Sequence, residues 1–541
     1  MSPPMNRIAD LVAQTLWSAG IRHAFGMPGG EVVTFIDALE RAGIRFVLAR
    51  NETAAAMMAA GTHAVTGAPG LLVTTLGPGL ANAVNGIADA SQEHAALIVV
   101  SGVVERHLRG RYTHQILDHA ALLHPLVKAS YEIEPEGAAA ITQRALNLAG
   151  TLPCGPVHLD LSPSVAALPA PDGAATVAPV RLARPDPAPN SPAIAELRDR
   201  LAAAERPLLL AGYEALRDGA TGTVTRLAET HSIPVFTTYK AKGLLDERHA
   251  CALGGAGLSP KADAILQPLL DRADLIIAAG YDPIEMRGNW LGAFKHPETV
   301  IELTAAPADH GMHHAGLRIA GSVAGLLAAA ETGLVRQPAW PEGEIGRAKT
   351  ALAEAFAAPA AWGPHAVIET LEAALPPDAV VTVDAGAHRI LLSQKLRVHR
   401  PGGLLQSAGF CTMGAALPLA IGVRTARPSA PVVAVMGDGG LEMVLGELGT
   451  LRDQRLPVVV LVLQDESLAL IELKQRQAGL DAIGVRMGAT DYAVIAQAFD
   501  GHGVTVSSVG ELHSAFETAF SASRFTVIAA RLDAADYIGR I

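Results

Sequence analysis

The stretch Val432-Val-Ala-Val-Met-Gly-Asp-Gly-Gly440 leads directly into Leu441-Glu-Met-Val-Leu-Gly-Glu-Leu-Gly-Thr-Leu451. Its apolar start is typical of a buried parallel strand, and the residues after Gly440 have helical periodicity. Small residues at a strand-to-helix turn let backbone N–H groups and a helix N-terminus face an anion. The stretch therefore predicts a phosphate-binding turn in an α/β domain.

A second carboxylate follows the next predicted strand. The run Pro457-Val-Val-Val-Leu-Val-Leu463 ends just before Asp465, which lies 27 residues after Asp438. A strand–helix–strand unit of that length returns the chain beside its start, so both acids can reach one Mg²⁺ at the same edge of the sheet. Gly-Asp-Gly alone also occurs in ordinary turns, and it is Asp465 that favours a metal site.

Similar apolar runs recur along the chain, separated by Ala-rich segments with helical periodicity. They occupy residues 70–75, 96–100, 206–212, 233–239, 273–280 and 379–383. This pattern indicates parallel strands with helices on both faces, so we predict an α/β protein with three doubly wound parallel-sheet domains. The predicted bounds are a first domain at 1–165, a linker at 166–192, a central α/β domain at 193–335, a linker at 336–364 and a third domain at 365–541. No internal sequence repeat is apparent.

The composition excludes several classes of protein. The 541 residues carry a net charge of −11 without a basic run, so nucleic acid is not an expected partner. No apolar run approaches the ~20 residues that span a bilayer, and the N-terminus lacks the pattern of a signal peptide. Cys154, Cys251 and Cys411 are odd in number and far apart, which fits reduced thiols. We expect a soluble, cytoplasmic protein with no membrane association.

The segment from Gly437 to Ser467 resembles the diphosphate–Mg²⁺ motif of thiamine diphosphate enzymes. The resemblance implies that Asp438, Asp465 and the Ser467 carbonyl ligate Mg²⁺. It also implies cofactor contacts at Gly437, Gly439, Gly440 and Leu468. The family usually has Asn where this chain has Asp465, so the site is expected to carry extra negative charge beside the diphosphate.

The first domain resembles the pyrimidine-binding domain of the same family. The similarity lies in four segments, Ala24-Phe-Gly-Met-Pro-Gly-Gly30, Arg50-Asn-Glu-Thr-Ala-Ala-Ala56, Thr75-Leu-Gly-Pro-Gly79 and Gly155-Pro-Val-His-Leu-Asp160. Glu52 matches the catalytic glutamate, which bonds N1′ of the aminopyrimidine and favours the tautomer that deprotonates thiazolium C2. Without this role Glu52 would be an acid on a helix surface.

A partial match lies in His114-Gln-Ile-Leu-Asp118, where relatives carry a Gln-Glu pair at the entrance of the active site. It gives Gln115 as a second catalytic candidate. We interpret His114 and His119 as surface histidines.

Two segments of the third domain also resemble cofactor contacts. Ser407-Ala-Gly-Phe-Cys-Thr-Met-Gly414 is similar to the segment that cradles the bent cofactor. By position, the Cys411 carbonyl would accept a hydrogen bond from the 4′-amino group and Met413 would pack beneath the rings, although the family commonly has Gly at Cys411. Asp384-Ala-Gly-Ala-His388 resembles a stretch near the diphosphate, which gives Gly386 and His388 as contacts.

The resemblance is closest to acetolactate synthase-like proteins. It implies a transferase or lyase that decarboxylates a 2-oxo acid, pyruvate by default, and ligates the fragment to a second carbonyl. Ile471 stands where simple pyruvate decarboxylases carry a glutamate, which favours carboligation. FAD is not expected, because no flavin pattern matches the central domain. A homodimer or homotetramer would pair Glu52 of one subunit with Asp438 of another.

Two other functions stay open. One is a 2-oxo acid decarboxylase or lyase without carboligation. The other is a non-catalytic protein that binds the cofactor, which the departures at Asp465 and Cys411 suggest.

Overall fold

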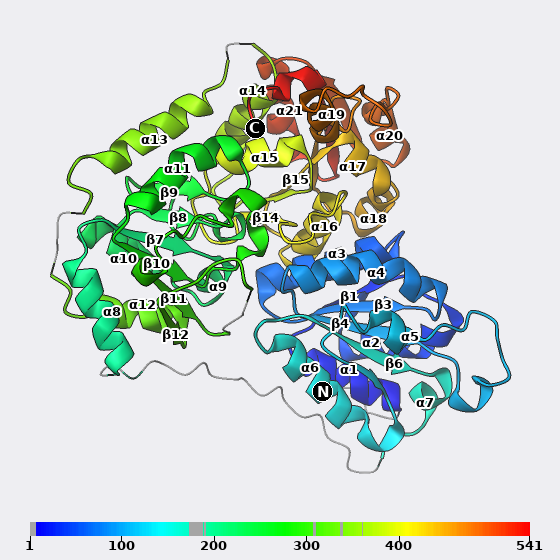
Figure 1. Cartoon of the computed structure of the whole chain (residues 1–541). Helices are drawn as coiled ribbons and strands as arrows, with labels where there is room; N and C mark the ends of the chain where they lie inside the picture. The colour runs from blue at the N-terminus through cyan, green and yellow to red at the C-terminus, as the bar shows by residue number, and fades with distance from the viewer. Residues whose placement is uncertain (1–6, 172–187, 189–190, 307–309, 336–338, 360) are drawn as a thin grey trace.

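The computed structural model describes residues 7–171, 188, 191–306, 310–335, 339–359 and 361–541. Within these residues the chain forms three six-stranded sheets, and neighbouring strands in each sheet run parallel. Helices cover the sheets (Figure 1). The predicted fold class is therefore confirmed.

The first sheet has the strand order β2-β1-β3-β4-β6-β5. Its strands are β1 (His23–Gly26), β2 (Arg45–Leu48), β3 (Gly70–Thr74), β4 (Leu97–Gly102), β5 (Ser130–Glu132) and β6 (Pro156–Leu161). Its helices are α1 (Ile8–Ser18), α2 (Val33–Ala42), α3 (Glu52–Thr66), α4 (Pro78–Gln92), α5 (His119–Leu123), α6 (Ala138–Gly150) and α7 (Pro163–Ala167).

The central sheet has the order β12-β11-β10-β7-β8-β9, a doubly wound arrangement. Its strands are β7 (Pro207–Ala211), β8 (Val235–Thr237), β9 (Ala252–Gly255), β10 (Leu275–Ala279), β11 (Val300–Thr304) and β12 (Leu317–Ala320). The associated helices are α8 (Pro192–Ala203), α9 (Tyr213–Arg217), α10 (Thr221–His231), α11 (Pro260–Arg272) and α12 (Val323–Glu331), with the 3₁₀ turn η4 at Tyr239–Ala241.

The third sheet has the order β14-β13-β15-β16-β18-β17. Its strands are β13 (Val380–Val383), β14 (Leu404–Gln406), β15 (Val432–Gly437), β16 (Val459–Gln464), β17 (His502–Val506) and β18 (Thr526–Arg531). Its helices are α14 (Pro364–Ala374), α15 (Ala387–Lys395), α16 (Ala416–Ala426), α17 (Asp438–Met443), α18 (Glu447–Gln454), α19 (Ala469–Gln477), α20 (Tyr492–Ala498) and α21 (Val509–Ser521).

The strand predictions are confirmed, but one helix prediction is wrong. Each apolar run identified in the sequence overlaps a strand. The helix expected over 441–451 is instead two helices, α17 and α18, because the helical turns stop at Val444 and restart after Gly446.

The predicted linkers lie partly outside the described residues. Positions 172–187, 189–190, 336–338 and 360 are not described. The second linker contains the helix α13 (Glu344–Ala355), which packs against α11. The exact domain bounds remain a prediction.

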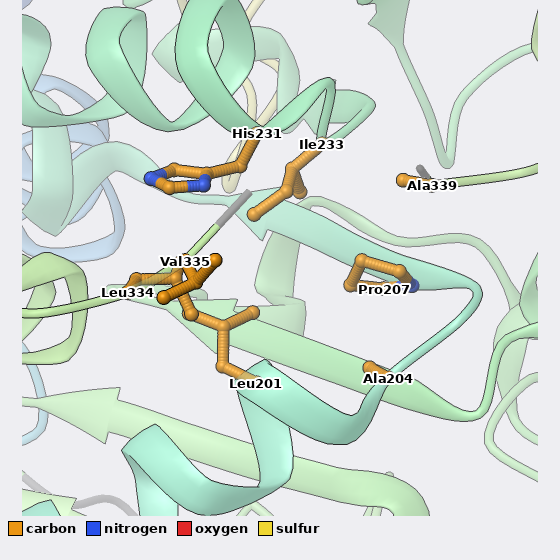
Figure 2. Close-up of a pocket in the computed structure, with 8 residues that line it drawn as sticks. All are labelled: Leu201, Ala204, Pro207, His231, Ile233, Leu334, Val335 and Ala339. Carbon is orange, nitrogen blue, oxygen red and sulfur yellow. The ribbon is translucent and has the colours of Figure 1, made fainter. Parts of the chain in front are cut away.

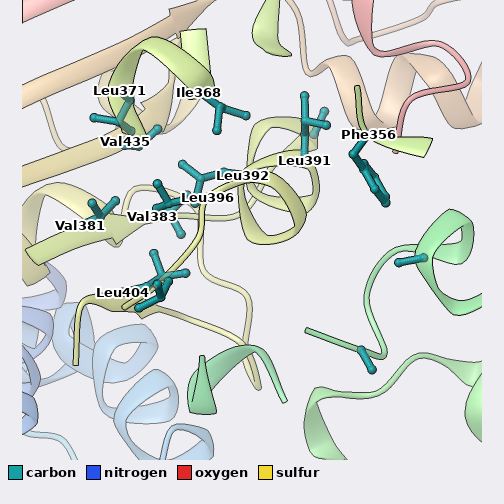
Figure 3. Close-up of a cluster of buried hydrophobic side chains, with 14 of the residues drawn as sticks. Phe356, Ile368, Leu371, Val381, Val383, Leu391, Leu392, Leu396, Leu404 and Val435 are labelled. Atoms are coloured by element: carbon teal, nitrogen blue, oxygen red, sulfur yellow. The ribbon is translucent and has the colours of Figure 1, made fainter. Parts of the chain in front are cut away.

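The apolar side chains of the third sheet form a buried core with the helices beside it. Figure 3 shows Val381, Val383 and Val435 from the strands, facing leucines of α14 and α15. These residues are nearly inaccessible to solvent, and burial of such side chains contributes roughly 1.5–3 kcal/mol each. This core holds the carboxyl ends of β13 and β15 in fixed positions.

The first and third domains meet through α3 and α16 (Figure 1). Two glycines allow close approach of the helices: a Cβ on Gly422 would lie 2.0 Å from the Met58 carbonyl oxygen, and one on Gly61 would lie 2.6 Å from that of Leu419. The contact fixes the start of α3 relative to the third sheet.

The longest helices, α3 and α4, have 15 residues each. Among the described residues, no helix is both long and apolar enough to cross a membrane.

Candidate functional site

Asp438 connects the carboxyl ends of two neighbouring strands. β15 and β16 pair in parallel with Gly437 opposite Leu463, so Asp438 and Asp465 follow adjacent strand ends. The buried Asp438 carboxylate accepts N–H hydrogen bonds from Asp465 (3.1 Å) and Glu466 (2.7 Å) through Oδ2, and from Gly439 (2.8 Å) through Oδ1. The structure thus brings together the two acids that the sequence predicts to share a site.

Ionisation is disfavoured at both carboxyl groups. Burial, and then the charge of Asp438, raise the pKa of Asp465 to about 8, and burial raises the pKa of Asp438. A divalent cation between them would remove this penalty, since hard oxygen donors suit Mg²⁺. The Ser467 N–H donates to Asp465 Oδ1 (3.0 Å), so the third predicted ligand residue lies in the same turn. These residues fit a bound Mg²⁺.

A histidine–aspartate pair lies beside this turn. Asp384 is fully buried, and its carboxylate contacts His388 Nε2 (2.9 Å) and accepts the Gly414 N–H (2.7 Å). The His388 ring lies over Gly386 and against Gly437, where an added Cβ would meet it at 2.4 Å and 3.4 Å respectively. Three predicted contact residues therefore gather around Asp384, which the sequence interpretation did not single out as a site residue.

The remaining glycines of the turn are similarly crowded. A Cβ on Gly440 would lie 2.1 Å from Asp384 Oδ2, and one on Gly439 would lie 3.1 Å from Leu468 Cδ2. Leu468, another predicted contact, therefore packs on the turn, and the Met487 side chain lies there as well. Glycine is needed at 440 because no side chain fits.

The segment from Ser407 to Met413, here called the cradle segment, joins β14 to α16. Cys411 is exposed and has a φ of 57°, a left-handed conformation that favours glycine. Met413 is half-buried and precedes Gly414, which is bonded to Asp384. The predicted contacts Cys411 and Met413 thus lie next to the Asp384 group.

Glu52 begins α3 in the first domain. Asn51 caps this helix by accepting the N–H groups of Thr53 and Ala54. The Glu52 side chain is 6% exposed, and its Oε2 accepts a hydrogen bond of 2.5 Å from Asn82 Nδ2 on α4. The alternative of an acid on a helix surface is therefore wrong, and no sequence motif pointed to Asn82 as its neighbour.

Gln115 lies on an exposed loop that passes the turn before α4. A Cβ on Gly77 would lie 2.3 Å from the Gln115 carbonyl oxygen, so the loop touches that turn through its backbone. His119 is buried, which corrects its interpretation as a surface residue; His114 is exposed. The Nδ1 of His119 contacts Asp160 (2.7 Å), and its Nε2 accepts the Gly77 N–H (3.2 Å).

The site residues therefore form two groups within one chain. Glu52 and Gln115 belong to the first domain, and Asp438, Asp465 and their neighbours to the third. Among the described residues, no hydrogen bond or ion pair joins Glu52 to Asp438.

The small pocket in Figure 2 belongs to neither group. It lies in the central domain, where Leu201, Pro207 and Ile233 are among its lining residues. Its volume of about 10 Å³ accommodates roughly one water molecule. No predicted site residue lines it.

Comparison with known proteins matches all three domains. The model of the thiamine pyrophosphate enzyme N-terminal TPP-binding domain matches residues 6–122, that of the central domain matches 194–330, and that of the C-terminal TPP-binding domain matches 384–530. These matches include Glu52, Asp438 and Asp465.

Several relatives are similar over most of their length. An acetolactate synthase of Bacillus subtilis is 30% identical over 98% of this chain and 94% of its own. The acetolactate synthase isozyme 3 large subunit of Escherichia coli is 30% identical over 95% of this chain and 92% of its own. A probable acetolactate synthase large subunit of Methanocaldococcus jannaschii is 29% identical over 86% and 81%. The chain therefore belongs to the thiamine pyrophosphate enzyme family and is acetolactate synthase-like.

Proposed function

We propose that this enzyme decarboxylates a 2-oxo acid, pyruvate by default, and joins the remaining fragment to a second carbonyl compound. The observation that carries the proposal is the Asp438 carboxylate, which accepts the N–H groups of Asp465 and Glu466 and so gathers two acids at one sheet edge. The relatives named above are acetolactate synthases, and their name supplies the substrate class.

Mg²⁺ would be held by Asp438, Asp465 and the Ser467 carbonyl. Burial, and then the charge of Asp438, raise the pKa of Asp465, and a cation held between the two carboxylates would favour their ionised forms. The glycines at 437, 439 and 440 let Asp384, His388 and Leu468 approach the turn closely. The diphosphate would bind beside these groups.

When bound, thiamine diphosphate would supply a nucleophilic carbon and an acceptor for the electron pair of the bond to the departing CO₂. Glu52 would hold a proton against N1′ of the aminopyrimidine, and the hydrogen bond from Asn82 keeps its Oε2 in place. The Cys411 carbonyl would accept from the 4′-amino group, and Met413 would support the rings. The low exposure of Glu52 keeps water away from its carboxyl group.

Ile471 supports carboligation over release of an aldehyde. It lies on α19, six residues beyond Asp465, and its side chain is 44% exposed. An apolar side chain there offers no proton to the fragment left after decarboxylation. Attack on a second carbonyl is therefore favoured over protonation.

We also infer a homo-oligomer whose active sites combine Glu52 of one subunit with Asp438 of the other. Large apolar side chains are exposed beside both groups: Tyr112, Ile116 and Leu117 flank Gln115, and Phe410, Met443, Ile471, Leu480 and Ile483 lie on segments around the third-domain site. Clustered exposed apolar side chains are typical of interfaces. A second copy of the chain would cover them and complete each site.

The role of Glu52 is tested by substitution. Glu52→Gln keeps the side-chain volume but removes the acid, so turnover of pyruvate with thiamine diphosphate and Mg²⁺ should fall by about 10²–10⁴-fold. The matched control is Glu344→Gln, because Glu344 is also buried but pairs with Arg206 and Arg272 in the central domain. If Glu52→Gln turned over pyruvate at the wild-type rate, Glu52 would not have the proposed catalytic role.

A further inference from the structure

One buried carboxylate accepts hydrogen bonds from residues near both ends of the cradle segment. Asp89, near the end of α4, is 2% exposed, and its Oδ1 accepts hydrogen bonds from Ser407 Oγ (2.6 Å) and Thr412 Oγ1 (2.8 Å). The Thr412 N–H in turn donates to Ser407 Oγ (3.0 Å). The chain from 407 to 412 is thereby closed into a loop around a side chain from another domain.

A second acid holds the middle of the same loop. Glu93 Oε1 accepts the N–H groups of Gly409 (2.6 Å) and Phe410 (3.3 Å). Gly409 lies against the end of α4, where an added Cβ would be 2.8 Å from the Gln92 carbonyl oxygen. The turn that leads into Cys411 therefore takes its shape from Glu93.

The central domain locks Glu93 in place. Lys240, on η4, donates to the Glu93 carbonyl (2.7 Å) and pairs with Glu93 Oε2 (2.8 Å), and its Nζ lies 4.2 Å from the centre of the Tyr213 ring. The neighbouring Tyr239 carbonyl accepts from Gln406 Nε2 (3.0 Å). The central domain thus contacts both Glu93 and Gln406, the residue just before the cradle segment.

This network holds several ionisable groups largely away from water. Burial and the charge of Glu93 raise the pKa of Asp89 to about 6, and burial raises the pKa of Glu285, which also contacts Lys240, to about 7. Buried ionic groups often stabilise less than apolar groups of the same size, and their best-supported role is to specify one geometry. A cavity of about 60 Å³ beside Asp89 and Lys240 also leaves the segment room to shift without them.

We propose that Asp89 and Glu93, locked by Lys240, are positioning residues that hold the cradle segment in the shape that binds the cofactor. This inference rests on the proposed function, because it gives the Cys411 carbonyl and Met413 their places beside the aminopyrimidine. Helix α4 would then serve both halves of the chemistry, since Asn82 near its start holds Glu52 and Asp89 near its end holds the cradle segment.

The first test needs no cofactor. Amide hydrogen exchange is compared in wild type, Asp89→Ala, Glu93→Gln and Thr412→Val, the last removing one hydroxyl at nearly constant volume. Exchange at Gly409, Phe410 and Thr412 should become at least about tenfold faster while exchange in the strands of the third sheet is unchanged. Unchanged exchange there in the folded variants would overturn the proposal.

Glu247→Gln is the matched control. Glu247 is likewise a buried glutamate that pairs with a lysine, Lys242 (2.6 Å), and accepts an N–H from the third domain, that of Val398 (2.7 Å). Its replacement should speed exchange near Val398 and leave the cradle segment protected.

The second test is titration calorimetry with thiamine diphosphate at saturating Mg²⁺. Asp89→Ala and Glu93→Gln should weaken binding at least about tenfold, Asp89→Asn should recover much of the affinity because its amide oxygen still accepts, and Glu247→Gln should bind as wild type does. Wild-type affinity in variants with a loosened cradle segment would overturn the positioning role. Failure of the wild-type protein to bind would instead overturn the proposed function, and the positioning role with it, whatever the exchange data show.

Discussion

At the scale of single residues, the proposed site concentrates backbone strain. Of eight non-glycine residues with positive φ in the described chain, Gln115, Cys411 and Glu466 lie in predicted site segments. Left-handed backbone costs such residues about 1–2 kcal/mol, and strain of this kind clusters where function requires it. The backbone of Cys411 therefore follows a path suited to glycine, the residue that the resemblance to the family implies at this position.

Cys411→Gly should therefore raise the free energy of unfolding by up to about 1 kcal/mol, because glycine adopts this φ without strain. Cys411→Ala keeps the strain and should leave stability close to wild type. Urea denaturation compares the two variants. A Cys411→Gly protein less stable than Cys411→Ala would show that the conformation is not strained.

At the scale of elements, burial explains which parts of the fold could be predicted. The core strands are buried on both faces, as β16 is along its whole length, so they appear as uninterrupted apolar runs. The break between α17 and α18 could not be predicted in this way. At this break the Arg50 N–H donates to Glu447 Oε1 (2.9 Å), and the Arg50 side chain lies against Gly446 and Gly449. These contacts come from the first domain, which is distant in the sequence.

The site, too, could be predicted only where its residues do not depend on contacts between distant elements. Glu52, Asp438 and Asp465 stand in recognisable motifs, whereas Asn82, Asp89 and Asp384 acquire their roles from partners in other elements. His119 is a clear case, since it is buried with its ring nitrogen against Asp160 at the end of β6. Periodicity reports which face of an element is apolar, but not which distant polar group it meets.

A polar network that joins β4, β5 and β6 should make the first domain sensitive to acid. His158 is fully buried between Ser130 (2.6 Å) and Ser101 (3.1 Å), and burial lowers its pKa to about 4. In the unfolded chain His158 binds a proton below about pH 6.5, whereas in the folded chain it does so only below about pH 4. The free energy of unfolding therefore decreases as the pH falls from about 6.5 to about 4.

At pH 5 this loss is on the order of 2 kcal/mol. His158→Gln lacks the ionisable group, so its unfolding midpoint should fall less between pH 8 and pH 5 than that of wild type. His114→Gln, at an exposed position, serves as the control. An equal fall in His158→Gln and wild type would exclude His158 as the source.

At the scale of the whole molecule, the first and third domains share a topology that the sequence does not reveal. Their orders, β2-β1-β3-β4-β6-β5 and β14-β13-β15-β16-β18-β17, are the same when strands are numbered within each domain. No sequence repeat accompanies this match, because burial demands apolar side chains in each strand but not the same ones. Two similar domains thus carry the two halves of the proposed site.

A site shared between subunits predicts complementation. In hybrid dimers of Glu52→Gln and Asp438→Asn chains, one of the two sites carries both substitutions and the other carries neither. Co-expression should therefore restore about one quarter of wild-type turnover, given random pairing of equal amounts of the two chains. Turnover no higher than that of either variant alone would place Glu52 and Asp438 of one chain in the same site.

The most direct test of the central claim is carbon-13 NMR of the products formed from labelled pyruvate by the protein with thiamine diphosphate and Mg²⁺. Carboligation predicts acetolactate and CO₂, with two pyruvate molecules consumed for each CO₂ released. Acetaldehyde formed in equal amount to CO₂, or pyruvate left unchanged by protein that has bound the cofactor, would contradict it.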